Sequence, residues 1–375
     1  MQHMRLSVIR YGLIGASIAI TASLHAQSLI WLGTLGGNQS VAHSLTVSNS
    51  GSVVAVGYAM NANNQSRAFR WENGVMSDLG TLGGGSSSAF AISADANTIV
   101  GQAATSSNQF RAFRYQNSPM QDLGTLGGAT SIAYGVSANG DTVVGSSQNA
   151  SAQTRAFRWQ GSTMQDLGTL GGATSVAYGV SGDGSVVVGY ATNASNQIRA
   201  FRWQGGTMQD LGTLGGVTSI AYGVSGDGSV VVGYATNASN QIRAFRWQGS
   251  TMQDLGTLSG GGTSTAFAVN ADGSIIVGRV ALPVVGNTAV RWVQSGSGYQ
   301  AENLNQVYAS LLSGSSYLIE ARALSNDGRY ITGYGYNAST NRFEAYLLDT
   351  VPEPASLMAL GAGLTGLLGL RRRRA

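Results

Sequence analysis

The stretch from Asp166 to Gln209 reads DLGTLGGATSVAYGVSGDGSVVVGYATNASNQIRAFRWQGGTMQ, and residues Asp210 to Gln253 repeat it with three substitutions. The phrase Asp-Leu-Gly-Thr-Leu recurs every 44 residues, beginning at Asp78, Asp122, Asp166, Asp210 and Asp254. A period of about 40 to 45 residues is the size of one four-stranded blade of a β-propeller. A residue that every copy carries is expected to hold the copy together rather than to perform chemistry.

Within one repeat, runs of strand-forming residues alternate with turn-forming residues. We expect four strands in the quoted stretch, at Val176–Ser181, Ser185–Ala191, Ile198–Trp203 and Thr207–Leu211. A Gly-Asp-Gly turn at 182–184 joins the first two, and the pair Gly215-Gly216 is expected to release the chain into the next repeat. Ordering 44 residues costs roughly 65 kcal/mol, so neighbouring repeats must cover the faces of each small sheet.

The two ends of the repeat region predict a closed ring. The glycine of the second strand recurs seven times, as Gly57, Gly101, Gly145, Gly189, Gly233, Gly278 and Gly333. Before the first copy stands an extra fourth strand, Ser28–Gly37, and the last copy stops at its third strand, Phe343–Asp349. We therefore predict an all-β, seven-bladed β-propeller over residues 27–350, closed by its N-terminal strand. An open β-solenoid is the alternative, although it would need capping repeats that the sequence does not show.

Composition excludes several classes of function. All 21 basic residues are Arg, and six of them lie at the two ends, which leaves 15 against 16 acids between residues 27 and 350. That balance gives no support for nucleic-acid binding. The chain has no Cys, and His3 and His25 lie near its start, so the repeat region keeps only His43. Thiolate chemistry and metal sites built from several histidines are excluded, and we expect no cofactor and no metal.

Residues 1–26 have the pattern of a secretory signal peptide with a signal helix. Arg5 and Arg10 precede an apolar run from Leu13 to Ala22, and Ala26 offers a small residue for cleavage. A short uncleaved membrane anchor is the alternative. Either way, the repeat region is expected to leave the cytoplasm.

Residues 351–375 combine three features in order. The motif Pro352-Glu353-Pro354 precedes an apolar run, Ala355–Leu370, and then the cluster Arg371, Arg372, Arg373 and Arg374. Sixteen helical residues span about 24 Å, short of the roughly 30 Å of a bilayer core, and the Arg cluster favours the cytoplasmic side. This tail resembles the PEP-CTERM sorting tail of bacteria. The resemblance implies that a membrane enzyme, exosortase, recognises and processes it; an ordinary C-terminal membrane anchor is the alternative.

The repeats also resemble the HAF family of extracellular repeats, over roughly residues 31–349. The family's His-Ala-Phe phrase is here Arg-Ala-Phe, as in Arg155-Ala156-Phe157 and Arg199-Ala200-Phe201. Because Arg replaces the His, no role of that His carries over. The resemblance implies an exported repeat protein and brings no established activity with it.

Residues that recur in every copy are interpreted as structural. The Asp of Asp-Leu-Gly and the Arg residues of Arg-Ala-Phe-Arg-Trp are expected to pair within each sheet; an inward ring of Arg that binds an anionic polysaccharide is the alternative. The recurrent Phe and Trp are expected in the core. The turns at Asp183, Asp227, Asp272 and Asp327 are interpreted as simple Asp-Gly turns rather than calcium loops, and the Asn-Ala-Ser triplets as polar loops.

The divergent sixth and seventh copies are the first place to look for a ligand. The candidate ligand surface consists of Arg279, Tyr299, Glu302, Glu320, Arg322 and Tyr330. Divergence also fits the seam at which the ring closes. We predict an exported, non-catalytic protein of the bacterial surface or exopolysaccharide matrix that acts in adhesion, matrix structure, or glycan or protein binding. A polysaccharide hydrolase or lyase that uses two carboxylates of this region is the alternative.

Overall fold

The computed structural model describes residues 27–116 and 118–351. The predicted signal helix (1–26) lies outside the described residues. So do the predicted hydrophobic helix of the tail and its sorting residues, Pro352, Glu353, Pro354, Arg371, Arg372, Arg373 and Arg374. None of the helices in the described ranges has the length and hydropathy that crossing a bilayer requires.

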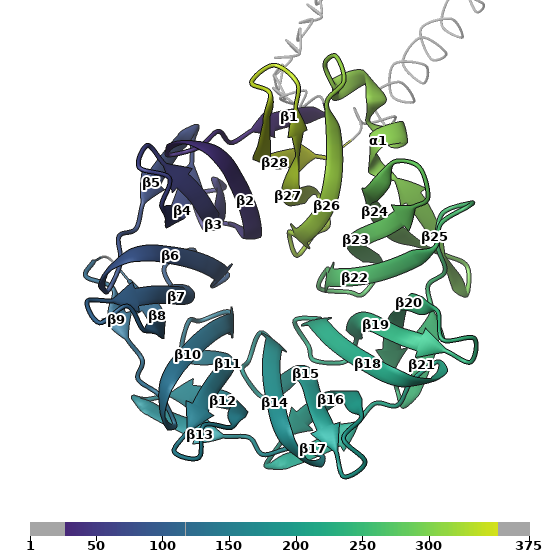
Figure 1. The fold of residues 1–375 in the computed structure, drawn as a ribbon. Coiled ribbons are helices and arrows are strands. Elements are labelled where there is room, and N and C mark those ends of the chain that lie inside the picture. The colour runs from purple at the N-terminus through teal and green to yellow at the C-terminus, as the bar shows by residue number, and fades with distance from the viewer. Residues whose placement is uncertain (1–26, 117, 352–375) are drawn as a thin grey trace, which may run out of the picture. The chain divides into compact units, whose positions relative to one another are not determined.

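The strands form five four-stranded sheets and one eight-stranded sheet, arranged around a central axis (Figure 1). The four-stranded sheets contain β6 Gly83–Ile92, β7 Ile99–Thr105, β8 Phe110–Tyr115 and β9 Gln121–Asp122; β10 Gly127–Val136, β11 Thr142–Asn149, β12 Thr154–Gln160 and β13 Thr163–Asp166; β14 Gly171–Val180, β15 Val186–Asn193, β16 Ile198–Gln204 and β17 Thr207–Asp210; β18 Gly215–Val224, β19 Val231–Asn237, β20 Ile242–Gln248 and β21 Thr251–Asp254; and β22 Thr263–Val269, β23 Ile275–Leu282, β24 Gly286–Ser295 and β25 Gly298–Asn303. Within each of these four-stranded sheets, neighbouring strands are antiparallel and consecutive in sequence.

The eight-stranded sheet is where the ring closes. It contains β26 Tyr317–Leu324, β27 Tyr330–Asn337, β28 Arg342–Asp349, β1 Ser28–Trp31, β2 Gly36–Val47, β3 Val53–Asn61, β4 Ser66–Glu72 and β5 Val75–Asp78. Strand β1 pairs antiparallel with β28, with Ser28 opposite Asp349 and Trp31 opposite Tyr346. One parallel bridge, Gln39–Phe343, joins β2 to β28. The predicted closure by the N-terminal strand is confirmed, and the open solenoid is wrong (Figure 1).

Several predicted strand limits are wrong at the glycine pairs. The first strand of the quoted repeat begins at Gly171, five residues before the predicted start, and Gly215-Gly216 opens β18 rather than releasing the chain. At Gly172 a Cβ atom would lie 2.3 Å from the Thr192 hydroxyl oxygen. Glycine therefore allows the first strand to begin in close contact with the second strand. Strand propensity alone predicts a strand end at such a glycine pair. For the same reason the predicted strand 28–37 is two elements: β1 ends at Trp31 and Gly36 already belongs to β2.

A short helical insertion between β25 and β26 was not predicted. Helix α1 spans Leu304–Val307 and a 3-10 turn spans Ala309–Leu311. Leu304 and Tyr308 are buried in the core between the two sheets that flank the insertion. The side chain of Asn305 accepts the Leu318 N–H at 2.6 Å and donates to the Leu318 carbonyl at 2.8 Å. The insertion thus holds the first strand of the last sheet in place.

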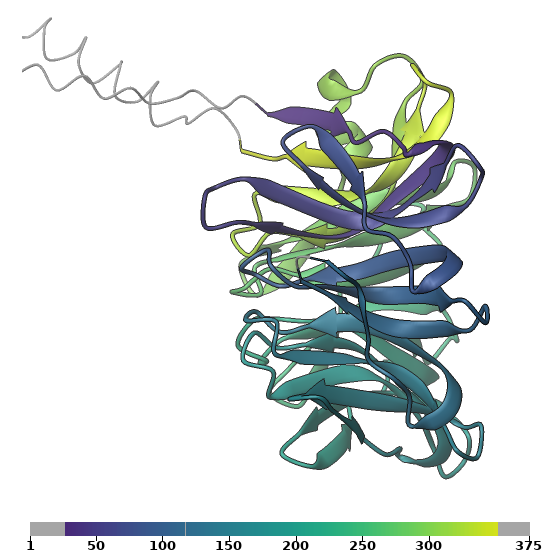
Figure 2. The ribbon, with the colours of Figure 1, turned by 90° about the vertical axis from the view of Figure 1, so that its left-hand side faces the viewer.

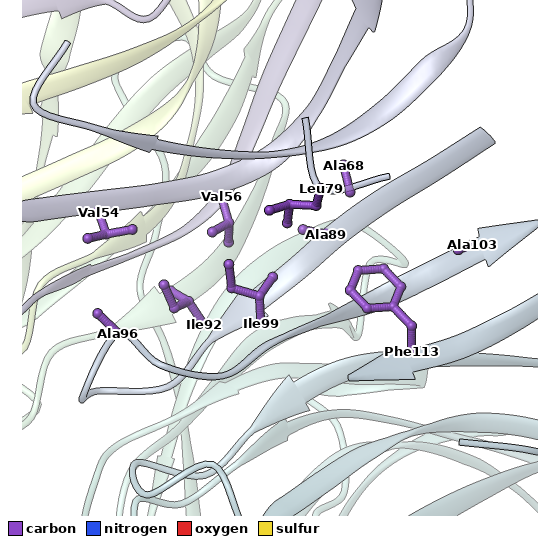
Figure 3. Close-up of a cluster of buried hydrophobic side chains, with 10 residues drawn as sticks. All are labelled: Val54, Val56, Ala68, Leu79, Ala89, Ile92, Ala96, Ile99, Ala103 and Phe113. Carbon is purple, nitrogen blue, oxygen red and sulfur yellow. The ribbon is translucent and has the colours of Figure 1, made fainter. Parts of the chain in front are cut away.

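The core lies between neighbouring sheets, which pack face against face (Figure 2). Val54 and Val56 of β3 contribute to one cluster together with Ile92, Ile99 and Phe113 of the next sheet (Figure 3). The recurrent aromatic residues are buried in these clusters, as expected: Phe69, Phe113, Phe157, Phe201 and Phe245 are fully buried, and Trp71, Trp159, Trp203, Trp247 and Trp292 nearly or fully so. The apolar faces of each sheet are buried only by packing against the neighbouring sheets. The stability of each sheet therefore depends on its neighbours.

Candidate functional site

The first strand of every repeat carries a β-bulge at the same position. In β14 the pairs Ala177–Gly189 and Gly179–Val188 leave Tyr178 between them without a partner. The other six first strands show the same register shift. A bulge bends its strand and re-aims the extra side chain. We call the seven bulged residues the collar: His43, Phe90, Tyr134, Tyr178, Tyr222, Phe267 and Arg322.

The collar surrounds a small cavity at the centre of the ring. Its seven side chains line 230 Å³, and the first strands that carry them are the strands nearest the central axis (Figure 1). Neighbouring rings contact one another in sequence, with centroids 5.0 Å apart for His43 and Phe90 and 5.0 Å for Tyr134 and Tyr178. These separations are those of favourable aromatic pairs. The guanidinium of Arg322 lies 5.9 Å from the Phe267 ring, so the circle continues through a cation–π contact.

The seven recurrent glycines of the second strand explain why the bulges fit. A Cβ atom on Gly189 would lie 1.9 Å from the carbonyl oxygen of Val176. At the other six positions the same distance is 1.9 or 2.0 Å. The bulge pushes the first strand against its partner, and only glycine leaves the necessary space. These recurrent glycines are a sequence signal for the bulges, although the collar residues themselves lie on the neighbouring first strand.

The residues that follow these glycines form a second set around the collar, which we call the flanking ring: Tyr58, Gln102, Ser146, Tyr190, Tyr234, Arg279 and Tyr334. Tyr190 lies 6.1 Å from Tyr178, and Tyr58 lies 5.7 Å from His43, measured between ring centroids. Burial raises the pKa of the tyrosines, most strongly at Tyr178 and, to about 12, at Tyr222. The phenols are therefore neutral hydrogen-bonding groups at any physiological pH.

The charge of the site is concentrated on one side of the collar. Glu320, 2% exposed, binds Arg279 at 2.5 Å and Arg322 at 2.7 Å, and the two arginine side chains remain 39% and 34% exposed. In the fourth repeat the position of Glu320 is held by Val176. Two guanidinium groups against one carboxylate leave one net positive charge.

His43, beside Arg322 in the collar, adds no charge. Removal of the ring from water, together with the charge of Arg322, lowers the pKa of His43 to about 3. Its Nδ1 lies 2.9 Å from the Ala89 carbonyl oxygen, and because a carbonyl only accepts, Nδ1 carries the proton. Nε2 is then an acceptor.

The opposite end of the axis has different chemistry. A 430 Å³ cavity there is lined by Leu45, Ile92, Val136, Val180, Val224, Val269 and Leu324 together with turn residues. Backbone hydrogen bonds link successive sheets around it, for example from the Ala138 N–H to the Gly182 carbonyl (3.0 Å) and from the Gly182 N–H to the Gly226 carbonyl (2.8 Å). This end holds the ring together, whereas the collar end presents aromatic and charged groups.

The structure brings together three of the six residues of the predicted ligand surface. Arg279, Glu320 and Arg322 meet at the collar. The other three lie elsewhere, each with its own partner. The Tyr299 hydroxyl donates to the Gly273 carbonyl, Glu302 binds Arg291 at 2.6 Å, and Tyr330 lies under the guanidinium of Arg329 at 4.8 Å. Sequence reasoning missed the tyrosines, because it treated residues of the identical copies as structural.

The recurrent Asp and Arg residues behave differently from the predicted pairing. Among the described residues only Arg67–Asp78 (2.9 Å) and Arg199–Asp210 (3.8 Å) form the expected ion pair. Every Asp of the phrase, paired with Arg or not, accepts the N–H of the glycine two residues later, as Asp166 does from Gly168 at 2.8 Å. This short turn bond holds the chain as it leaves the fourth strand.

The second Arg of the phrase reaches the next sheet. Arg158 donates to the Gly184 carbonyl at 3.2 Å, and Arg114 and Arg202 make the same kind of contact with Gly140 and Gly228. These arginines lie on the third strands, and none of them lines the collar cavity. The alternative prediction, an inward ring of these recurrent arginines, is therefore wrong.

The Asp-Gly turns are satisfied by their own residues. Asp183 accepts the Ser181 hydroxyl at 2.5 Å and the Ser185 N–H at 3.0 Å, and the first of these bonds is the main reason why its pKa falls to about 2. The Asn193 side chain likewise accepts the N–H groups of Ser195 and Gln197 within its loop. In the part of the chain that the structure describes, no three His, Asp or Glu side chains gather as a metal site would require.

Comparison with known proteins supports the tail and the fold. The family model for the PEP-CTERM protein-sorting motif matches residues 350–374, and no curated protein matches the chain. Among solved structures, the β-propeller domain of the trilobed protease from Pyrococcus furiosus superposes with a TM-score of 0.50 at 9% identity, covering 84% of this chain and 96% of that one.

Two further solved structures are more distant. TolB from Acinetobacter baumannii has a TM-score of 0.48 at 11% identity and covers 69% of this chain, which in turn spans only 65% of TolB. The gluconolactonase XC5397 from Xanthomonas campestris has a TM-score of 0.42 at 11% identity, with 89% and 93% covered.

These findings define the class: the described residues have a β-propeller fold. The PEP-CTERM motif implies recognition by exosortase and export through the membrane to the cell surface. The resemblance of the repeats to the HAF family stays a prediction.

Proposed function

We propose that the chain is a non-catalytic, exported propeller of the bacterial surface or exopolysaccharide matrix that binds a glycan through its collar. The observation that carries the proposal is the circle of six aromatic rings and one guanidinium around the axis. Adhesion to the matrix, or cross-linking of it, would follow from such binding.

The collar has the chemistry that sugars need. A pyranose presents an apolar C–H face, which packs on aromatic rings, and a rim of hydroxyls, which need hydrogen-bonding groups beside those rings. Tyrosine supplies both in one side chain. Three collar residues are tyrosines, Tyr134, Tyr178 and Tyr222, and four more stand in the flanking ring. Because their pKa values are raised, they stay neutral and keep their O–H donors.

The charges of the site favour binding over hydrolysis. Cleavage of a glycosidic bond commonly uses two carboxyl groups, about 5 to 10 Å apart on either side of the bond. Glu320 is held between two arginines, and Glu302 is bound to Arg291, so the two carboxylates contact different partners. His43, which would otherwise be the natural proton carrier, has its pKa lowered to about 3. A hydrolase or lyase remains the alternative that turnover assays would reveal.

The proposal includes the organisation of the chain. Residues 1–26 would be removed as a signal peptide, 27–350 would form the propeller, and 351–375 would serve as the sorting tail. The proposed propeller would have seven blades, with the two halves of the eight-stranded sheet as separate blades; the pairing of β1 with β28 supports this division.

A glycan panel tests the function directly. The secreted protein would be applied to immobilised bacterial polysaccharides, alongside Tyr178→Ala and a matched control, Phe110→Ala, which removes an exposed aromatic residue away from the collar. We expect Tyr178→Ala to weaken binding about tenfold, as loss of one stacking side chain would, and Phe110→Ala to leave it unchanged. Equal binding by both variants would overturn the collar as the site. If the parent protein releases reducing ends from a polysaccharide, the proposed binding function is wrong and hydrolysis is the function.

A further inference from the structure

The geometry points to a narrower ligand class: we propose that the collar binds a carboxylate-bearing polysaccharide, with one acidic sugar held by Arg279 and Arg322 and the chain leaving past Ser146. This inference rests on the glycan-binding function proposed above. It adds the charge of the ligand and the path that it follows.

The charged side of the collar has donors left for a ligand. Glu320 occupies Nη1 of Arg279 and both Nε and Nη2 of Arg322. Each guanidinium carries five N–H groups, so both arginines keep N–H donors that Glu320 does not use. Both side chains are more than a third exposed, so a ligand can reach those donors. With His43 neutral, the site has one net positive charge. A carboxylate accepts from guanidinium groups in the planar geometry that these side chains favour.

The buried glutamate sets the direction of these arginines. Glu320 is 2% exposed and holds one guanidinium on each of its carboxylate oxygens. Both guanidinium groups lie near the same ring, Phe267, at 5.8 Å and 5.9 Å. The pair is therefore positioned before any ligand arrives, which lowers the ordering cost of binding. No other repeat places an ionised residue in the collar or the flanking ring.

On the opposite side of the collar, a second cavity lies behind the aromatic rings. The flanking ring has tyrosine at Tyr190 and Tyr234, whereas the third repeat has Ser146 at that position. A 260 Å³ cavity occupies the resulting space between β11 and β14 and shares Tyr134 and Tyr178 with the collar cavity. Because these two rings are in contact, at 5.0 Å between centroids, a polymer chain that occupies both cavities would pass over them.

This second cavity lies across the ring from the arginines. Counted around the collar from Arg322, His43, Phe90 and Tyr134 lie on one side, and Phe267, Tyr222 and Tyr178 on the other. The contacting pair Tyr134 and Tyr178 is therefore halfway round. A chain anchored at Arg322 that crosses the collar reaches this pair, and beyond it Ser146 leaves space for the chain to continue.

The experiment uses the secreted chain and defined oligosaccharides. Galacturonate oligomers of one to six residues would be titrated by calorimetry, alongside the same oligomers with their carboxyl groups reduced to neutral galactose. We expect the acidic hexamer to bind at least tenfold more tightly than its neutral counterpart. Arg322→Gln should remove that preference, about a tenfold loss, and Arg342→Gln, an exposed arginine on β28, should not.

Ser146→Tyr tests the path. It recreates the tyrosine that the fourth and fifth repeats already carry, so the fold is expected to tolerate it. The hexamer should lose about tenfold in affinity while the monomer is unaffected, and the control Ser195→Tyr, at an exposed loop residue, should bind the hexamer as the parent does. If Ser146→Tyr binds every length as the parent does, the proposed path is wrong.

Three outcomes separate this inference from the function on which it rests. Equal binding of acidic and neutral oligomers, unaffected by Arg322→Gln, overturns the charge selectivity and leaves glycan binding standing. No binding of any oligomer, with binding to neutral polysaccharides retained, also overturns the acidic ligand alone. Tighter binding of polyglutamate than of galacturonate shows that the site reads an acidic peptide, which contradicts both proposals.

Discussion

The side-chain oxygen of Ser40 accepts the backbone N–H of Ala345 at 2.9 Å, although the two residues stand 305 positions apart in the chain. Ser40 also donates to the Gly33 carbonyl. The same bond joins successive sheets elsewhere, between Ala68 and Ser87, Ala112 and Ser131, Ala156 and Ser175, Ala200 and Ser219, and Ala244 and Ser264. The seam of the ring is thus made with the bond that joins its other sheets.

Removing this hydroxyl should weaken the seam as much as an internal junction. Ser40→Ala and Ser175→Ala each leave a buried N–H without its acceptor, which costs about 1–3 kcal/mol. We expect both to lower the free energy of unfolding in urea by that amount. Ser195→Ala, at an exposed loop residue, is the control. A loss for Ser175→Ala but not for Ser40→Ala would mean that closure contributes little to stability.

Filling the space at a bulge should be costly. In Gly189→Ala the new methyl group meets a backbone carbonyl at 1.9 Å, which cannot move without disturbing the first strand. We expect a loss of about 1–3 kcal/mol or more in unfolding free energy. The control is Gly226→Ala, where nothing lies within 4 Å of the new methyl group and where other repeats already have Ala138 or Ala271. Equal stability of the two variants would contradict the packing argument.

Acid should destabilise the ring through His43. Its pKa is lowered to about 3 in the folded protein and is near 6.5 when unfolded. Between those values the unfolded chain binds the extra proton, so stability is complete above pH 6.5 and falls as the pH is lowered, by at most about 1.4 kcal/mol per pH unit.

The variant His43→Phe introduces phenylalanine at a collar position, and two other repeats already have phenylalanine there, as Phe90 and Phe267. From pH 7 to 5.5, before carboxylates titrate, its unfolding free energy should be flat while that of the parent declines. The slopes are compared rather than absolute stabilities, because the variant also loses the hydrogen bond to Ala89. Parallel slopes would show that another group controls the pH dependence.

Chelation of divalent ions should leave stability unchanged. The carboxylate of Asp183 is already engaged by Ser181 and Ser185, and Asn139, at the equivalent place in the third repeat, accepts the Ser137 hydroxyl at 2.8 Å. Asp183→Asn should therefore unfold at nearly the parent temperature, with or without EDTA or added Ca²⁺. Calcium-dependent stabilisation that disappears in Asp183→Asn would establish a metal loop.

Sorting should depend on the tail rather than on the propeller. Glu353→Ala alters the motif that the PEP-CTERM model matches. We expect the parent to be secreted with a mass lower by about 24 C-terminal residues, and the variant to keep its tail and stay in the inner membrane fraction. Mass spectrometry of each cell fraction measures both. A parent protein with an intact tail, found only in the inner membrane, would refute processing.

The repeat period and the unmatched end strands were enough to predict sheets and closure. The collar was not predictable in the same way, because a bulge shifts the alternation of inward and outward residues by one and hides which side chain faces the axis. A signal did exist. In Ala-Tyr-Gly-Val of the fourth repeat, the second position becomes His43, Phe90 or Arg322 elsewhere, while its neighbours stay small or aliphatic. Searching only the divergent copies found the arginines and missed Tyr178 and Tyr222.

The assumption that repeated residues are structural fails in a ring for a geometric reason. In a ring, the equivalent positions of all the repeats face the same central axis. A residue type that recurs in every repeat can therefore line one shared cavity. The insertion at Leu304–Val307 was missed for a different reason. A four-residue helix has too short a period to stand out, and its role depends on Asn305 contacting Leu318 thirteen residues later.

The bulged position lies outside the ladder of hydrogen bonds, and the register on either side is the same whether it holds His43, Phe90, Tyr178 or Arg322. The seven residues at the bulged positions can therefore be substituted without a change in the register of strand pairing. Descendants of this scaffold that differ only there would share one architecture and recognise different molecules.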